Sequence, residues 1–97
     1  MERDAVISKL REHEAGLRRL GVERLYLFGS VARGEAGPDS DVDLFFDYPK
    51  GKLGLLGLME VKDEATRILG RRADVTTRDG LHKTLRRRIE ASALRVF

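Results

Sequence analysis

An alternation of acidic and apolar residues over 41–46 constrains the fold of this chain more than any other feature. Asp41 and Asp43 alternate with apolar residues at the period of a β-strand, and the apolar positions are Val42, Leu44 and Phe46. Residues two apart on a strand point to the same face, about 6.5–7 Å apart along the chain. The segment therefore predicts a strand that buries one face in a core and presents two carboxylates on an open face.

These two carboxylates indicate a site for a divalent cation. Left alone, Asp41 and Asp43 repel each other and lose solvation, and a cation relieves both penalties. Carboxylate oxygens are the ligands that Mg²⁺ prefers, and Mg²⁺ takes one or two of them from protein and the rest from phosphate and water. We therefore expect Asp41 and Asp43 to bind Mg²⁺ together with a phosphorylated substrate.

A loop that contains glycine follows an apolar segment that we expect to form a buried strand over 22–28. Gly29 allows the backbone to approach a phosphate closely, and Ser30 offers a hydroxyl and an N–H group. A helical turn over 31–33 would add free N–H groups, and Arg33 would be within reach of a phosphate or of the loop. We therefore predict a phosphate-binding loop beside the carboxylate pair.

A third carboxylate lies on a later expected strand, over 73–77. Ala73 and Val75 are expected to bury one face of this strand, which leaves Asp74 on the other face. In two-metal phosphoryl transfer, one ion holds the leaving phosphates and the other activates the attacking oxygen. A third acidic group serves the activating ion or acts as general base, so Asp74 is a further candidate catalytic and metal-binding residue.

The remaining periodicities complete an α/β (α+β) pattern within one domain spanning 1–97. Apolar residues at helical spacing predict helices over 4–20, 55–69 and 82–91. The expected order is helix, strand, strand, helix, strand, helix, with a turn over 48–52 and no assignment for the tail. We expect a small mixed three- to four-stranded sheet with helices packed on one face.

The composition excludes several kinds of site and of protein. There is no cysteine, which excludes disulfides, thiolate zinc sites and cysteine nucleophiles. The 19 basic and 16 acidic side chains leave a net charge of +3, and this mild excess does not lead us to expect direct nucleic-acid binding. The charged segment 1–20 lacks the apolar run of a signal peptide, and the uncharged stretch 53–59 is too short to cross a bilayer. We expect a cytoplasmic protein with no membrane partner.

Two other motifs for metal or phosphate fail at required positions. Leu44 stands where an EF-hand loop needs glycine, and Lys50 stands where it needs a bidentate glutamate. Gly29 and Gly34 have the spacing of a Walker A loop, but Glu35 replaces its lysine. Neither an EF-hand nor a Walker A loop is therefore expected.

Three consecutive arginines lie on the last expected helix. They are Arg86, Arg87 and Arg88. Consecutive positions fan around a helix axis and do not form one stripe. We interpret them as a solvated helix surface, and the alternative is a patch for a partner or RNA.

Taken together, the two motifs resemble the signature of the polymerase-beta-like nucleotidyltransferase superfamily. Residues 29–34 read Gly-Ser-Val-Ala-Arg-Gly, and residues 40–44 read Ser-Asp-Val-Asp-Leu. Short members of the superfamily, the minimal nucleotidyltransferase (MNT) antitoxins, have Gly-Ser-x-Ala-Arg-Gly, a gap and Ser-Asp-x-Asp-Leu. Every fixed position of that pattern is filled in this chain.

This resemblance implies a nucleotidyltransferase fold, with ATP as substrate and Mg²⁺, in two ions, as cofactor. The implied nucleotide-binding residues are Gly29, Ser30, Arg33 and Ser40. The implied catalytic and metal-binding residues are Asp41, Asp43 and Asp74, of which Asp74 matches only by its position on a later strand.

The resemblance also implies an acceptor. Many MNT antitoxins adenylylate a tyrosine on a partner HEPN ribonuclease toxin and silence it, so the implied function is transfer of AMP from ATP to a hydroxyl of such a toxin. The stripe of Leu55, Leu58 and Met59 is most simply core, but part of it and the apolar tail 94–97 could cover the partner. Two alternatives stay open: a module that neutralises the toxin by contact, and a transferase acting on a small molecule or an RNA end.

Overall fold

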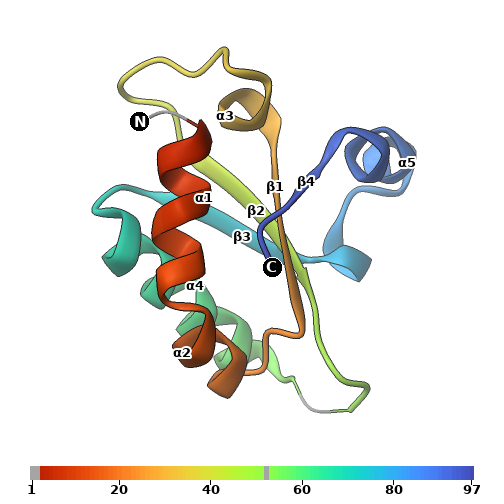
Figure 1. Cartoon of the computed structure of the whole chain (residues 1–97). Coiled ribbons are helices and arrows are strands. Elements are labelled where there is room, and N and C mark those ends of the chain that lie inside the picture. Colours follow the sequence, from red (N-terminus) through yellow and green to blue (C-terminus); the bar gives the residue numbers. More distant parts are fainter. Residues whose placement is uncertain (1–2, 52) are drawn as a thin grey trace.

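Four strands form one mixed sheet in the order β3-β2-β1-β4 (Figure 1). The computed structural model describes residues 3–51 and 53–97, so Lys52, the last residue of the expected turn, lies outside the described residues, as do the first two residues of the segment 1–20. The strands are β1 (Arg24–Phe28), β2 (Val42–Asp47), β3 (Ala73–Thr77) and β4 (Leu94–Arg95). β1 pairs antiparallel with β2 and with β4, and β2 pairs parallel with β3. The expected mixed sheet is confirmed.

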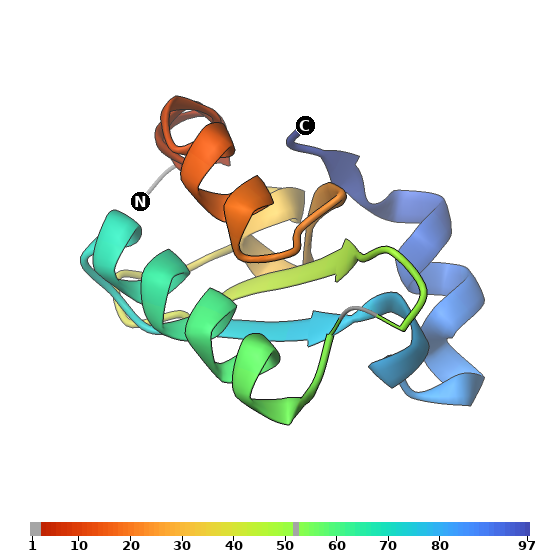
Figure 2. The same ribbon diagram turned by 90° about the horizontal axis from the view of Figure 1, so that it is seen from below.

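Helices flank this sheet on two sides. In the described chain they are α1 (Arg3–Glu12), α2 (Glu14–Arg19), α3 (Gly29–Arg33), α4 (Leu55–Leu69) and α5 (Lys83–Ser92), with a 3₁₀ turn η1 (Arg78–Gly80). α1 and α4 lie against each other on one side of the sheet, and α5 stands apart from them on the other side (Figures 1 and 2). No helix among the described residues has the length and apolar character needed to span a membrane.

The core lies between the sheet and the layer of α1 and α4. Alternate strand residues point to it, so that Leu27 of β1 lies beside Leu44 of β2, and both are fully buried. The helices contribute Val6, Leu10, Val61, Ala65, Ile68 and Leu69. Burying a side chain of the size of leucine contributes about 1.5–3 kcal/mol. This core fixes one face of the sheet and leaves the other face to carry the polar residues.

Most expected elements are confirmed, and one helix differs. The helix over 55–69 and the strand over 73–77 form with the expected bounds. The helix expected over 4–20 is interrupted at His13, between α1 and α2. The ring Nδ1 of His13 lies 3.0 Å from the carbonyl oxygen of Lys9. The side chain of His13 therefore occupies the position that a backbone N–H group would take at this carbonyl in a continuous helix.

Two apolar segments lie where the sequence did not lead us to expect them. Val96 is fully buried, and its N–H group donates a hydrogen bond to the carbonyl oxygen of Leu25 at 2.8 Å. The expectation that the tail covers a partner is therefore wrong for Val96, because the tail completes the protein's own sheet. Leu55 and Met59, expected in the core, are 75% and 53% exposed, because only the later turns of α4 face the sheet.

Candidate active site

A row of side chains crosses three strands on the sheet face that points away from the core. The register pairs Phe28 of β1 with Asp43 of β2, and Asp43 with Asp74 of β3. Neighbouring strands lie about 4.8 Å apart, so the two aspartates are adjacent. Asp41 lies just before β2, two residues from Asp43. The structure therefore brings all three candidate carboxylates together at one end of the sheet.

Asp43 is the most crowded carboxylate of this row. Burial raises the pKa of Asp43 above its ordinary 3.8, the negative charges of Asp74 and Asp41 raise it further, and the charge of Arg33 opposes the shift. Asp41 has a basic neighbour, since Nε of Arg72 lies 3.7 Å from its carboxylate. The pKa of Asp43 is therefore raised first by burial, and the negative charges of the row add to the shift.

The donor chemistry of the row fits a divalent cation. A cation between the carboxylates would cancel the repulsion that adds to the effect of burial on the pKa of Asp43. All three groups are hard oxygen donors, which suit Mg²⁺ better than softer metals. Within residues 3–51 and 53–97, no three acidic or histidine side chains are gathered closely enough to hold an ion as they stand.

Gly29 lies directly against Asp43. It begins α3 immediately after β1 and has a φ of 77°, in the left-handed region that favours glycine. A Cβ atom at this position would lie 2.1 Å from Oδ2 of Asp43. Only glycine therefore fits, and the close approach places the first turn of α3 beside the carboxylate row.

The short helix α3 confirms the helical turn expected over 31–33. Among the described side chains, none caps the start of α3. The N–H groups of Gly29 and Ser30 are therefore not used by a side-chain cap and can meet an anion. Arg33 ends the same turn, and its Nε lies 3.2 Å from Glu35 in an exposed ion pair. Such exposed pairs are weak, so Arg33 is free to turn toward a stronger anion.

Ser40 organises the loop that leads into β2. Its hydroxyl oxygen accepts a hydrogen bond from the N–H of Gly37 at 2.9 Å, and its own N–H donates to the Gly37 carbonyl at 3.2 Å. The carbonyl oxygen of Ser40 accepts a hydrogen bond from Arg71. These bonds fix the approach of the chain to Asp41, and a direct role for Ser40 in nucleotide binding stays a prediction.

Aromatic side chains cover the same face of the sheet one row beyond Asp43. Phe45 is fully buried, and its ring stacks on that of Tyr26 with the centroids 4.8 Å apart. The guanidinium carbon of Arg78 lies 5.0 Å from each ring centroid. The open face is therefore confined to the end of the sheet that carries the carboxylates.

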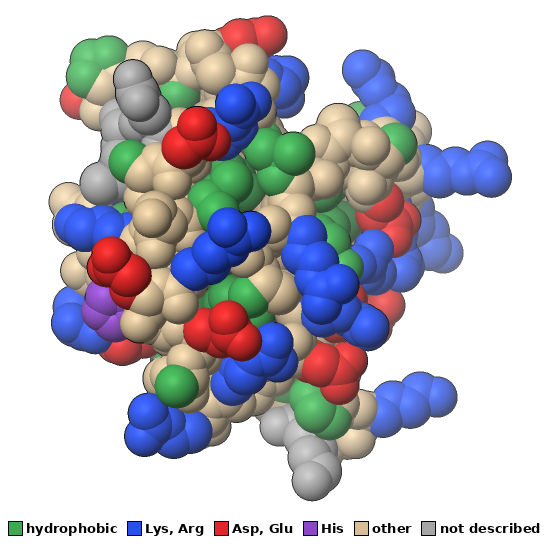
Figure 3. Space-filling model, viewed as in Figure 1, with side chains coloured by type: hydrophobic (Ala, Val, Ile, Leu, Met, Phe, Trp, Pro, Cys, Tyr) green, Lys and Arg blue, Asp and Glu red, His purple; other side chains and the backbone are tan. Residues whose placement is uncertain are grey.

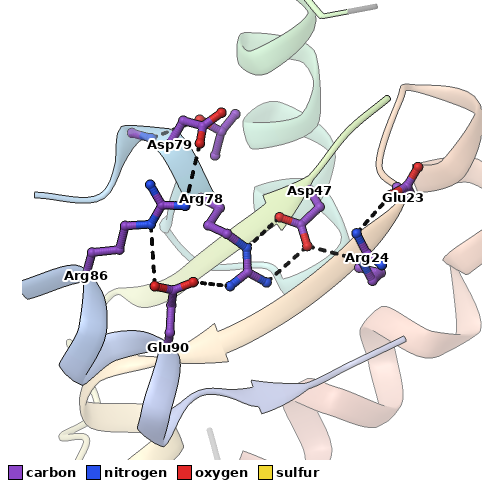
Figure 4. A network of polar contacts seen from close by, with 9 residues as sticks. Glu23, Arg24, Asp47, Arg78, Asp79, Arg86 and Glu90 are labelled. Carbon is purple, nitrogen blue, oxygen red and sulfur yellow. Dashed lines mark hydrogen bonds and ion pairs between the residues drawn. The ribbon is translucent and has the colours of Figure 1, made fainter. Parts of the chain in front are cut away.

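A network of ion pairs attaches α5 to the sheet (Figure 4). Arg78 donates to both carboxylate oxygens of Asp47, at 2.7 and 3.0 Å, and also to Glu90 of α5. Arg24 pairs with Asp47 at 3.1 Å. The hydrogen bonds from Arg78 hold the pKa of Asp47 below its ordinary value, and the same bonds raise the pKa of Arg78. The sequence contains no local sign of this network, because Arg78 and Asp47 are 31 residues apart.

Comparison with known proteins finds a family model and relatives that match most of the chain. The model of the family described as nucleotidyltransferase domain matches residues 10–96. Protein adenylyltransferase MntA of Thermococcus cleftensis is 35% identical over 91 residues, which cover 89% of this chain and 91% of that protein. A Methanocaldococcus jannaschii protein, provisionally named a protein adenylyltransferase, is 39% identical over 77 residues, which cover 79% of this chain and 82% of that protein.

Solved structures share the fold. One that is described provisionally as a minimal nucleotidyltransferase matches with a TM-score of 0.82 and 33% identity, over 97% of this chain and 95% of that chain. A chain in the complex of tri-AMPylated Shewanella oneidensis HEPN toxin with MNT antitoxin matches with a TM-score of 0.67 and 15% identity. The match covers 98% of this chain and 71% of that chain. A chain of a toxin–antitoxin structure with AMP-PNP matches with a TM-score of 0.72 and 18% identity, over 90% of this chain and 72% of that chain. The last two likenesses concern the fold alone.

Proposed function

This chain belongs to the nucleotidyltransferase domain family, and on that premise we propose that it transfers AMP from ATP to a hydroxyl group of a partner HEPN toxin, for which it acts as the antitoxin. One observation carries the proposal: Asp43 and Asp74 are neighbours in the sheet, and Gly29 lies directly against Asp43. Nucleotidyl transfer needs carboxylates that hold a cation and a backbone that approaches phosphates. The position of the carboxylate row beside the start of α3 supports both requirements.

The proposed reaction is an in-line displacement at the α-phosphorus of ATP. The acceptor oxygen forms a bond to this phosphorus while the bond from the phosphorus to the bridging oxygen of pyrophosphate breaks. The products are the adenylylated acceptor, pyrophosphate and the proton of the hydroxyl group. Asp74 activates the hydroxyl, and its carboxylate accepts this proton.

The other candidate residues bind the nucleotide. Asp41 and Asp43 would hold Mg²⁺, which when bound stabilises the negative charge that develops on the phosphate oxygens. Gly29 and Ser30 offer N–H groups to the triphosphate, and Ser30 adds its hydroxyl. Arg33 leaves its exposed pair with Glu35 and binds a phosphate, because a guanidinium can donate two parallel hydrogen bonds to one phosphate.

A tyrosine of a HEPN toxin is the acceptor that we propose. The relatives support a protein acceptor, since MntA of T. cleftensis is named a protein adenylyltransferase and the S. oneidensis toxin is tri-AMPylated in its complex with an MNT antitoxin. An adenylyl group adds bulk and the negative charge of a phosphate, which would exclude RNA from a ribonuclease site. Holding enzyme and acceptor in one complex gives a high effective concentration, so a slow transferase can still modify its partner fully.

The test incubates the purified chain with ATP, Mg²⁺ and a HEPN protein of the same organism. We expect the HEPN protein to gain the mass of one or more adenylyl groups, which tandem mass spectrometry should locate on tyrosine. Asp43→Asn should give no added mass. Asp39→Asn is the matched control, because Asp39 is exposed and lies outside the carboxylate row.

Other outcomes separate the alternatives. A stable complex with no added mass would favour neutralisation by contact. The absence of both complex and transfer would overturn the HEPN proposal and favour a small molecule or an RNA end as acceptor.

A further inference from the structure

A cavity lies between α5 and the start of α3, and we refer to it as the α5 cavity. Its volume is about 620 Å³, and its lining includes Phe28, Gly29 and Arg33 on one side and Leu85, Arg88 and Ile89 of α5 on the other. Small-molecule sites typically have volumes of about 300–1,000 Å³. The α5 cavity is therefore large enough to hold part of a nucleotide.

The α5 cavity lies on the flank of the carboxylate row away from Asp74. The sheet order β3-β2-β1 places Asp74, Asp43 and Phe28 in sequence along the row. Phe28 and Gly29, at the far end, line the cavity. If the acceptor hydroxyl lies at Asp74, the leaving group of an in-line displacement lies on the opposite side, which is the side of the α5 cavity.

Two arginines from different elements line the α5 cavity. Arg33 and Arg88 line it from opposite elements, and none of the described residues that line it is acidic. Within the described chain, no acidic side chain lies within ion-pair distance of Arg88, whereas Arg33 pairs with Glu35 and its charge also acts to lower the pKa of Asp43. Figure 3 shows the basic side chains that project from α5. The cavity therefore favours an anion with more than one negative charge.

The three consecutive arginines of α5 have different surroundings. Arg86 lies 3.4 Å from Glu90 and 3.7 Å from Asp79, so it belongs to the network that holds the helix. Arg87 and Arg88 are both exposed, and of these two only Arg88 lines the α5 cavity. The interpretation as a solvated surface therefore fits Arg87, whereas Arg88 is exposed and also lines the α5 cavity.

We propose that Arg88 is a nucleotide-binding residue that, with Arg33, binds the β- and γ-phosphates of the nucleotide in the α5 cavity. This inference rests on the proposed function, because it assigns a place to the leaving pyrophosphate of that reaction. Gly29 lies against Asp43 and also lines the cavity, so a triphosphate whose α-phosphate lies at Asp43 extends past Gly29 toward Arg88. Guanidinium groups suit this role because each can donate two parallel hydrogen bonds to a phosphate.

Calorimetric titration of the intact protein with ATP and with AMP, both in Mg²⁺, tests the inference. Arg88→Ala should weaken ATP binding by about 10-fold, the value of one charge-assisted hydrogen bond. AMP binding should be unchanged, because AMP has no β- or γ-phosphate. The ATP affinity of Arg88→Lys should lie between those of Arg88→Ala and the wild-type protein, since lysine keeps the charge and loses the bidentate geometry. Arg87→Ala is the matched control and should bind both nucleotides like the wild-type protein.

The outcomes distinguish this inference from the proposed function. Equal ATP affinity in Arg88→Ala and the wild-type protein would overturn the inference and leave the transfer reaction standing. An equal loss for ATP and AMP would also overturn it, because Arg88 would then act on the nucleoside or the α-phosphate. A wild-type protein that neither binds ATP nor modifies the HEPN protein would overturn both. Equal thermal midpoints of Arg87→Ala and Arg88→Ala would show that any loss of binding does not come from unfolding.

Discussion

Replacing Arg78 with methionine removes the guanidinium that joins β2 to α5 and keeps an unbranched apolar stem. The change deletes two hydrogen bonds to Asp47 and one to Glu90. The side chain of Asp47 is only 14% exposed and keeps a single basic partner, Arg24. Losing hydrogen bonds to a charged group costs about 1.5–3 kcal/mol, and breaking a fully buried ion pair costs about 3–5 kcal/mol. Because Arg78 is 25% exposed, we expect a loss of about 2–3 kcal/mol.

Urea and thermal unfolding followed by circular dichroism measure this loss. For a domain of 97 residues, 1 kcal/mol shifts the thermal midpoint by about 4–8 °C, so Arg78→Met should lower it by roughly 10–20 °C. Arg78→Lys should lower it less. Arg67→Met is the matched control, because Arg67 forms an exposed pair with Glu64 and its loss should barely move the midpoint. A loss below about 0.5 kcal/mol for Arg78→Met would refute the argument, since that is the range of ordinary surface substitutions.

The same network predicts a dependence on pH. Arg78 holds the pKa of Asp47 below its ordinary 3.8. A carboxyl group whose pKa is lowered in the folded state stabilises the fold above the unfolded pKa and loses that contribution as the pH falls through the folded pKa. The difference in stability between the wild-type protein and Arg78→Met should therefore shrink below about pH 4. A constant difference down to pH 2 would contradict the assignment of the effect to Asp47.

Three further changes test the carboxylate row. Asp43→Asn should abolish Mg²⁺-dependent transfer. It should also raise the thermal midpoint at pH 7 in EDTA. The reason is that a carboxyl group whose pKa is raised in the folded state destabilises the fold as the pH rises above about 3.8. Asp74→Ala should lower the transfer rate by about 10²–10⁴-fold in steady-state kinetics, and unchanged kinetics would exclude it as the general base. Gly29→Ala should weaken ATP binding and lower the unfolding midpoint, because its Cβ would lie 2.1 Å from Oδ2 of Asp43. Gly16→Ala, which has open space around it, should not lower the midpoint.

The parts of the fold that follow from local periodicity could be predicted from the sequence. The helix over 55–69 and the strand over 73–77 have their own pattern of apolar residues, and Gly70 ends the helix in a left-handed conformation. β4 could not be predicted, because its two residues become a strand only by pairing with β1. The break at His13 likewise depends on a contact between a side chain and the backbone, which interrupts an otherwise continuous helical pattern.

The candidate site shows the same division. The spacing of Asp41 and Asp43 was enough to place both at one end of a strand, and Asp74 follows from the parallel pairing of β2 with β3. Alternation alone predicted an open face along all of β2, whereas Phe45 on that face is fully buried beneath Arg78. The proposed role of Arg88 also depends on the position of α5 relative to the sheet, and the sequence pattern of α5 does not predict that position.

The attachment of α5 has a consequence for the motions of the C-terminal third of the chain. Leu81, just before the helix, and Val96, just after it, are 7% and 0% exposed, whereas none of the ten described residues of α5 itself is buried. Local opening needs least free energy where few apolar contacts are lost. Opening of the helix would therefore cost few apolar contacts, and the ion pair of Arg78 with Glu90 is the main contact that it would have to break. In hydrogen–deuterium exchange, the amides of α5 should exchange faster than those of β1 and β3, and a ligand in the space beneath the helix should slow them selectively.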